Sequence, residues 1–257
     1  MVLFAGFLAM TCQNKTPQVS EEIPLDAQQI VDRAILAHGG DAYQGQQIAF
    51  DFREKHYEAT LNGGRFSYLR QFETEDGLIS DRLDNDGFTR YLEGEVLPIA
   101  DSMADKYANS VNSVIYFALL PYFLNDRAAN KSLLGYSKLD STDYYLIKVT
   151  FDEEGGGKDF DDEFLYWVHP QTFLIDHLAY SYAVDGGGLR FRKGYAPRVM
   201  GGIRFLDFIN YKADHHRFEL GQLDSLYQAG GLTELSRIEL TKLNVTPFSP
   251  AEDQTGL

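Results

Sequence analysis

The chain has 257 residues, a formal net charge of −15 and a single cysteine. A negative charge of this size, with no basic stripe to offset it, argues against a nucleic-acid partner. One cysteine also excludes an internal disulfide and any cysteine-based zinc site. Hydrophobic residues make up 44% of the sequence, enough for a sizeable core, and the 16 tyrosines and 18 phenylalanines favour strands over helices.

The chain opens with an apolar run from Val2 to Met10. This run is about half the length that a membrane-spanning helix needs, and it fits the apolar region of a secretory signal. The positive charges that usually precede such a region are absent after Met1. We nevertheless expect residues 1–11 to be a signal peptide because of the length and composition of the run.

The only cysteine follows directly, in the sequence Ala9-Met10-Thr11-Cys12. This segment resembles the lipobox of bacterial lipoproteins, in which small or apolar residues precede a cysteine. The resemblance implies cleavage before Cys12, lipidation of its sulfur and attachment to a membrane. Residues 12–24 are then a polar, lipidated tether, and we expect the protein on the periplasmic face of the outer membrane. The alternative is an ordinary secretory signal followed by a chance cysteine.

The folded part begins near Leu25 with a helical pattern. Asp26 is the expected N-cap, apolar residues recur at helical spacing, and Gly39-Gly40 marks the end. His38 lies in the last turn, where a side-chain donor can cap the free carbonyl groups. We therefore interpret His38 as a cap and not as a catalytic base.

From residue 48 the apolar period becomes two. The segments "IAFDFREKHY" and "RFSYLRQF" each place apolar residues on one face, and "NGG" at 62–64 between them is a hairpin signal. Further turns and strands follow as far as residue 92, with connections too short for crossover helices. The pattern predicts an antiparallel meander.

A different segment, "DSMADKYANSVNSVIYFALLPYF" at residues 101–123, interrupts the strands. Ser102 and Asp105 have the spacing of a capping box, which predicts a helix start there. The second half, residues 114–124, is apolar nearly all round and needs cover on several sides. We expect this helix to lie inside a curved sheet, with a kink or an end at Pro121.

Strands resume at residue 144 and continue beyond residue 230. Several are apolar on both faces, such as "EFLYWV" at 163–168, and an antiparallel strand of this kind needs cover on both sides. The predicted fold class is therefore α+β, with a strongly curved antiparallel sheet, or half-barrel, wrapped around inserted helices.

Within this series, "WVHPQTFLID" at 167–176 is similar to the recurring strand–turn–strand of the lipoprotein-carrier superfamily of LolA and LolB, with His169 replacing the usual Asp or Asn. The order of elements resembles that superfamily too, and most of all its uncharacterised lipoproteins. The resemblance implies one half-barrel domain over 25–245 and a C-terminal tail at 246–257. It also implies an apolar cavity for an acyl chain or lipoprotein-like ligand, without catalysis.

Two sets of side chains are candidates for such a cavity. Arg190, Arg192 and Arg204 lie on neighbouring strands and are candidates for an anionic head group, although they could equally pair with surface carboxylates. The alternative for the apolar set is that it fills a closed core, which would favour a protein-interaction scaffold. The apolar candidates are Phe50, Phe66, Tyr68, Ile115, Phe117, Tyr166, Trp167 and Phe205.

An enzyme is the remaining alternative. A hydrolase or metal-dependent enzyme would need His56, His177 and His215 to meet carboxylates at the mouth of the half-barrel. His215 stands beside His216 in a segment that we expect to be a polar loop, and the six histidines show no HxH or HExxH spacing. No serine lies in a nucleophile-elbow pattern. We therefore expect no catalytic residue, no metal site and no cofactor.

Overall fold

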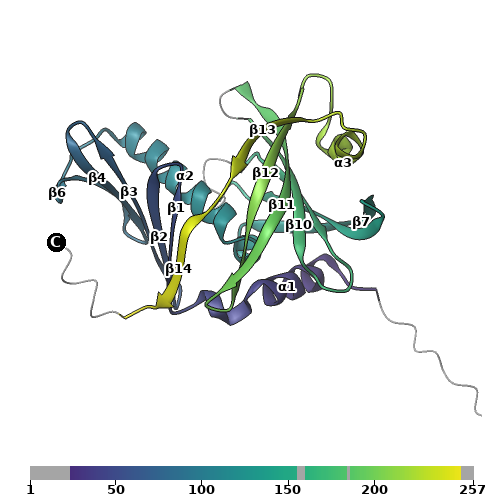
Figure 1. Ribbon diagram of the computed structural model, residues 1–257, viewed down its shortest axis with the longest axis horizontal. Helices are drawn as coiled ribbons and strands as arrows, with labels where there is room; N and C mark the ends of the chain where they lie inside the picture. Colours follow the sequence, from purple (N-terminus) through teal and green to yellow (C-terminus); the bar gives the residue numbers. More distant parts are fainter. Residues whose placement is uncertain (1–23, 155–159, 184–185, 250–257) are drawn as a thin grey trace, which may run out of the picture.

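The computed structural model describes residues 24–154, 160–183 and 186–249. Cys12 and the expected signal peptide lie outside these residues. The described residues form two antiparallel sheets of seven strands each (Figure 1). The strand order is β14-β1-β2-β3-β4-β5-β6 in the first sheet and β13-β12-β11-β10-β9-β8-β7 in the second.

Most strands follow one another along the chain as hairpins, which confirms the expected antiparallel meander. The strands of the first sheet are β1 (Gln46–Phe52), β2 (Lys55–Asn62), β3 (Arg65–Thr74), β4 (Gly77–Asp84), β5 (Gly87–Leu92), β6 (Glu95–Val96) and β14 (Thr241–Pro247). Those of the second sheet are β7 (Ala129–Leu139), β8 (Thr142–Phe151), β9 (Glu163–Val168), β10 (Ile175–Tyr182), β11 (Gly188–Met200), β12 (Ile203–Ala213) and β13 (Thr233–Ile238).

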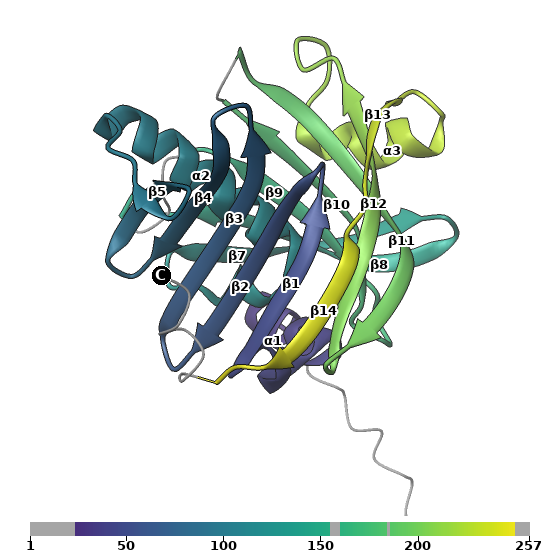
Figure 2. The ribbon, with the colours of Figure 1, turned by 60° about the vertical axis from the view of Figure 1, so that its left-hand side comes forward.

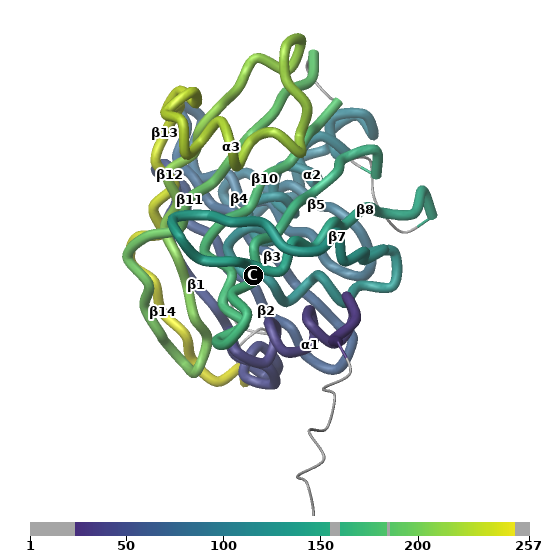
Figure 3. Tube along the Cα trace, turned by 90° about the vertical axis from the view of Figure 1, so that its right-hand side faces the viewer, coloured from purple at the N-terminus to yellow at the C-terminus, as the bar shows by residue number. Residues whose placement is uncertain are grey.

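The helices cover the sheets from different sides. Figure 2 shows the first sheet in front of α2, so that this helix lies between the two sheets. Figure 3 shows α1 and α3 at opposite ends of the molecule. The helical elements are α1 (Ala27–His38), α2 (Asp101–Ala118), α3 (Leu223–Gln228) and the short 3-10 turns η1 (Gly40–Tyr43), η2 (Tyr122–Asn125) and η4 (Leu220–Gln222).

Helix α1 begins and ends where the sequence predicts. The Asp26 carboxylate accepts a hydrogen bond from the backbone N–H of Gln29, whose side chain reaches back to the Asp26 N–H, so the helix starts with a capping box. At the other end His38 Nδ1 donates at 2.9 Å to the carbonyl oxygen of Ala34 one turn earlier, whereas the free carbonyls of Ile35 and Leu36 are bonded by the N–H of Gly39.

Three predicted boundaries differ from the structure. Strands resume at Ala129, in β7, and not at residue 144. The segment "IAFDFREKHY" is not one strand, because Arg53 and Glu54 both have positive φ and form the tight turn between β1 and β2. The capping box expected at Ser102 is also wrong, since α2 begins after Ala100 and has no side-chain cap. The cap was predicted only from the spacing of Ser102 and Asp105. Helix α2 starts earlier, so that Asp101 already lies in its first turn.

Helix α2 packs firmly on the first sheet and less closely on the second. Val111, Ile115 and Leu119 are fully buried against residues of β1, β2 and β3. The opposite side of the helix, including Tyr116 and Phe117, faces a separate apolar cluster on the second sheet. The apolar second half of this segment is therefore enclosed between two sheets, as its composition requires.

The two sheets are joined by a strand that changes partner. The predicted strand "SRIELTKL" divides at Glu239 and Leu240 into β13, which pairs with β12, and β14, which pairs with β1. Asp207 accepts a 3.0 Å hydrogen bond from the Leu240 N–H at this point, and Arg198 binds both Asp207 and the Leu240 carbonyl. The predicted α+β class, with curved antiparallel sheets around a helix, is confirmed.

Candidate functional site

A cavity of about 560 Å³ lies between the C-terminal half of α2 and the inner face of the second sheet. Its volume falls in the range of roughly 300–1,000 Å³ that is typical of small-molecule sites. Because α2 is pressed against the first sheet by Val111 and Ile115, the space remains on the side of the helix that faces β9 to β13.

Most of the cavity wall is apolar and aromatic. Phe117 of α2 lies 5.4 Å, between ring centroids, from Tyr180 of β10 and 6.2 Å from Phe164 of β9, so three elements contribute rings to one surface. Such a wall excludes water and suits a hydrocarbon chain. The apolar lining residues are Phe52, Val114, Phe117, Ala118, Ala128, Phe151, Phe164, Leu206, Phe208, Ile238 and Leu240.

One part of the wall is polar and carries positive charge. Arg190 and Arg192 are two residues apart on β11, so their side chains leave the same face of the sheet, and both line the cavity. The Arg192 Nη2 donates to the Tyr180 hydroxyl at 2.9 Å, and the Arg190 guanidinium donates to the Tyr182 hydroxyl. The cavity wall therefore combines an aromatic surface with two guanidinium groups, and the carboxylates of Asp126 and Asp162 also belong to its lining.

Of the eight apolar candidates, only Phe117 lines this cavity. Phe50, Tyr68 and Ile115 are buried in the cluster that joins α2 to the first sheet, with Phe66 packed against it, and Phe205 enters the same cluster from β12 of the second sheet. These side chains fill the core because α2 lies closest to β3, β4 and β5 and its C-terminal half joins one apolar cluster with residues of β1, β2 and β3.

The two remaining candidates lie on opposite faces of β9. Tyr166 is buried beside the cavity and its hydroxyl lies 3.0 Å from that of Tyr116. Trp167 points to the outer face of the second sheet, where it donates to Ser137 and packs under α3 with Phe191. The two-sided strand is covered on both faces, as predicted.

The structure places Arg204 away from the two cavity arginines. Its guanidinium forms an ion pair with Asp176 at 2.6 Å and lies 3.2 Å from His38 Nε2. Since His38 Nδ1 donates to a carbonyl, Nε2 is the acceptor and the ring is neutral. Burial lowers the pKa of His38 to about 4, and the nearby Arg204 acts in the same direction.

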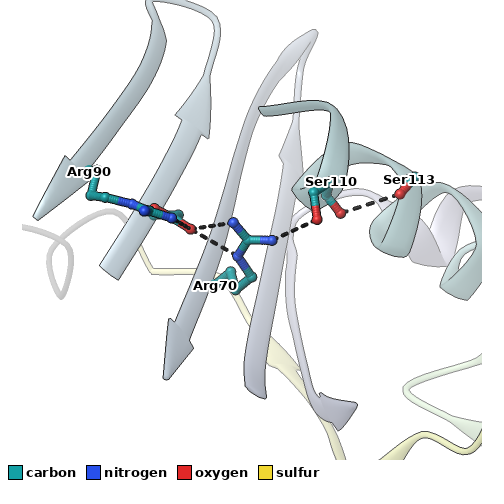
Figure 4. Close-up of polar contacts among 5 residues, drawn as sticks. Arg70, Arg90, Ser110 and Ser113 are labelled. Atoms are coloured by element: carbon teal, nitrogen blue, oxygen red, sulfur yellow. Dashed lines mark hydrogen bonds and ion pairs between the residues drawn. The ribbon is translucent and has the colours of Figure 1, made fainter. Parts of the chain in front are cut away.

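A second group of arginines lies under the first sheet, beside the N-terminal half of α2 (Figure 4). Asp81 of β4 is fully buried and accepts hydrogen bonds from both Arg70 of β3 and Arg90 of β5. Arg70 also donates to Ser110 of α2 at 2.8 Å, and Arg90 lies over the ring of Tyr107. Here the carboxylate and the helix already occupy the guanidinium donors.

The histidines considered for catalysis are not brought together. His56 lies on β2 between Asp51 and Glu58, whereas His177 of β10 is buried on the outer face of the second sheet against Tyr144 and Phe191. His215 and His216 are exposed in the loop after β12, as predicted for a polar loop. Within the described part of the chain, no group of three or more His, Cys, Asp or Glu residues could hold a metal ion.

Sequence reasoning missed most of the residues that form the wall. Phe164, Tyr180 and Phe208 belong to strands that were predicted, and their alternation places them on the inner faces. Alternation shows which residues share a face, but it does not show which part of that face remains uncovered by α2. Tyr180 and Tyr182 had a usable signal, since they alternate in the same way as the two arginines of the next strand.

The comparisons with known proteins agree with this fold. A LolA superfamily protein from Nitrosomonas europaea is similar over 89% of this chain and 97% of its own, at 10% identity and a TM-score of 0.48. A DUF1329 family protein from Desulfovibrio piger is similar over 88% of this chain and 95% of its own, at 15% identity and a TM-score of 0.51. At identities of 10% and 15%, these likenesses are of fold alone.

No helix in the described ranges has the length and apolar character needed to cross a membrane. No curated protein matches the sequence. Residues 10–240 match the family of unknown function DUF6503, and the chain therefore belongs to that family.

Proposed function

We propose that this protein is a membrane-anchored envelope lipoprotein that binds an apolar ligand, such as an acyl chain, in the cavity between α2 and the second sheet. It acts by binding and not by catalysis. The observation that carries this proposal is the cavity of about 560 Å³ with its wall of aromatic side chains. A tightly packed core would leave no space of this size, because protein interiors contain few voids larger than a water molecule.

The anchor is proposed from the sequence. The segment ending in Cys12 resembles a lipobox, and a polar stretch separates it from the start of α1. A stable anchor needs more than one acyl chain, which diacylglycerol on the Cys12 sulfur supplies. The cavity would then lie close to a bilayer, which is a source of acyl chains.

Native mass spectrometry with organic extraction tests ligand binding. The protein is the chain from residue 20 onward, exported to a periplasm. We expect a co-purifying lipid or fatty acid at about one per chain. A mass that corresponds to protein alone, unchanged after incubation with lipid vesicles, would overturn the binding proposal and favour a protein-interaction scaffold.

A pair of variants on α2 links binding to the cavity. Val114 lines the cavity, so Val114→Trp fills it, whereas Lys106 lies on an exposed part of the same helix. We expect Val114→Trp to lose the co-purifying lipid and Lys106→Trp to retain it. Equal retention by both variants would show that the lipid is held elsewhere.

A separate experiment tests the anchor. The full chain should fractionate with membranes and show the mass of an acylated protein, and Cys12→Ser should release it in soluble form. Membrane association that persists in the Cys12→Ser variant, or an unmodified mass of the parent, would refute lipidation. This result would leave the cavity proposal unaffected.

A further inference from the structure

The cationic part of the cavity wall is built from adjacent strands. Tyr180 lies opposite Arg190 in the pairing of β10 with β11, and Asn210 lies opposite Arg192 in the pairing of β11 with β12. All four residues line the cavity. Three neighbouring strands thus present polar groups to one cavity.

Arg192 is a buried cation whose charge is not neutralised. The residue is only 7% exposed, and its guanidinium carbon lies 3.7 Å from the centroid of the Phe117 ring. Its Nε is buried and has no hydrogen-bond partner. In the described ranges no carboxylate forms an ion pair with Arg192 or with Arg190.

The groups in direct contact with Arg192 carry no negative charge, although Asp126 and Asp162 line the same cavity. Tyr180 accepts one hydrogen bond from Arg192, and the rings of Phe117 and Tyr180 offer only cation–π contacts. Burial lowers the pKa of the Arg192 guanidinium, as expected for a cation without a carboxylate partner. An arginine stays protonated in a protein even so, and a buried unpaired charge is unfavourable until a partner binds.

A second polar atom beside Arg192 is also unpartnered. The Asn210 side chain donates to Ser236, but its Oδ1 is buried and accepts no hydrogen bond from the described residues. Buried polar atoms in folded proteins are nearly always satisfied, so two such atoms on facing residues mark a place that is incomplete without a bound group.

From these observations we infer that the cavity binds an anionic amphiphile, with a carboxylate or phosphate head group held by Arg190 and Arg192. Its hydrocarbon chain lies along Phe117, Phe164 and Phe208. This inference rests on the proposed function and names the class of its ligand. Guanidinium groups suit both head groups, because they donate parallel hydrogen bonds to carboxylate and phosphate oxygens.

Three ligands with the same chain test the inference: laurate, dodecyl phosphate and dodecanol. They are added to the full chain carrying Cys12→Ser, which has no acyl group of its own, and binding is measured by titration calorimetry. We expect at least one of the two anions to bind about tenfold or more tighter than dodecanol, since charged hydrogen bonds are worth more than neutral ones. The tighter anion identifies the head group.

Variants assign the effect to the arginines. Arg190→Gln and Arg192→Gln should each remove most of the preference for the anion while leaving dodecanol binding within about twofold. Arg237 of β13 is the matched control: it is exposed, pairs with Glu234 and lies on the other face of the strand from Ile238, which lines the cavity. Arg237→Gln removes the same charge and should keep the preference. If Arg192→Gln does not fold, the half-buried Arg190 still provides the test.

The outcomes separate this inference from the proposed function. Equal binding of the anions and dodecanol by the parent overturns the anion site and leaves the apolar cavity standing. A preference that survives both arginine substitutions also overturns it. Absence of binding by all three ligands overturns the inference and the proposed function together.

Discussion

Two pairs of arginines lie on the inner faces of the two sheets, and they differ in their partners. Arg70 and Arg90, under the first sheet, share the buried carboxylate of Asp81. Arg190 and Arg192, on the second sheet, contact tyrosine hydroxyls and aromatic rings, and no described carboxylate pairs with them.

The comparison separates a structural role from a binding role for the same residue type. The first pair shares the carboxylate of Asp81 and is tied to α2 through Ser110, so its hydrogen-bond donors serve to hold the helix on the sheet. The second pair stands at a cavity with unused donor capacity. An arginine that pairs with a carboxylate of the protein stabilises the fold, whereas an arginine without such a carboxylate can bind an anionic ligand.

The largest expected effect is at the centre of the first pair. Asp81→Asn leaves two buried guanidinium groups without a carboxylate and should lower the free energy of unfolding by about 3–5 kcal/mol, measured by urea denaturation. Asp84→Asn on the same strand is the control, because its ion pair with Arg82 is partly exposed and should cost less than about 1 kcal/mol. Similar losses in the two variants would contradict a structural role for the first pair.

Arg204 shows whether the role of an arginine depends on its ion-pair partner or on the sheet to which it belongs. Arg204 belongs to the second sheet but pairs with Asp176 and with the neutral ring of His38. Because the pKa of His38 falls from 6.5 to about 4 on folding, the unfolded chain binds more protons between these values. The free energy of unfolding should therefore fall by about 2 kcal/mol between pH 7 and pH 5 through this group.

His38→Gln checks that prediction, since the variant cannot titrate at this position. Its stability should depend less steeply on pH between 7 and 5 than that of the parent, as followed by thermal unfolding at several pH values. Some dependence will remain, because burial also lowers the pKa of His177. An unchanged pH profile in His38→Gln would show that the ring is not buried as a neutral acceptor.

A smaller effect is expected where the first pair meets α2. Ser110→Ala removes the acceptor of the Arg70 hydrogen bond and should cost about 1 kcal/mol. Ser113→Ala is the control, since its hydroxyl bonds only to the carbonyl of its own helix at 3.3 Å. Equal effects in urea denaturation would show that the contact between sheet and helix adds nothing at Ser110.

The smallest effect on stability is expected at the second pair. Arg192→Met removes an unpaired buried cation, so the relief of its desolvation offsets the lost contact with Phe117, and the ligand-free protein should change by less than about 1 kcal/mol. Arg70→Met, in contrast, breaks a buried ion pair and should cost several times more. A loss at Arg192 as large as that at Arg70 would remove the distinction between the pairs.

Local patterns in the sequence determined where helices and strands form and which of them must be covered on several sides. Asp26, Gly39 and the turn at 62–64 act on their immediate neighbours, and these elements lie where they were predicted. The all-round apolar character of residues 114–124 required cover on several sides, and α2 indeed lies between two sheets. Alternation along the strands likewise indicated that both faces of β9 are buried.

The tertiary structure alone decided which faces meet and which charges are paired. Ile48 of β1 lies opposite Val245 of β14, and no local pattern relates segments so far apart. Phe50 became core and Phe117 cavity wall because α2 presses on the first sheet and leaves space beside the second. Arg204 forms an ion pair with a carboxylate, whereas Arg192 forms none with the described residues. An ion pair requires side chains from different strands to lie within a few ångströms of each other. The spacing of residues along the sequence does not determine that distance.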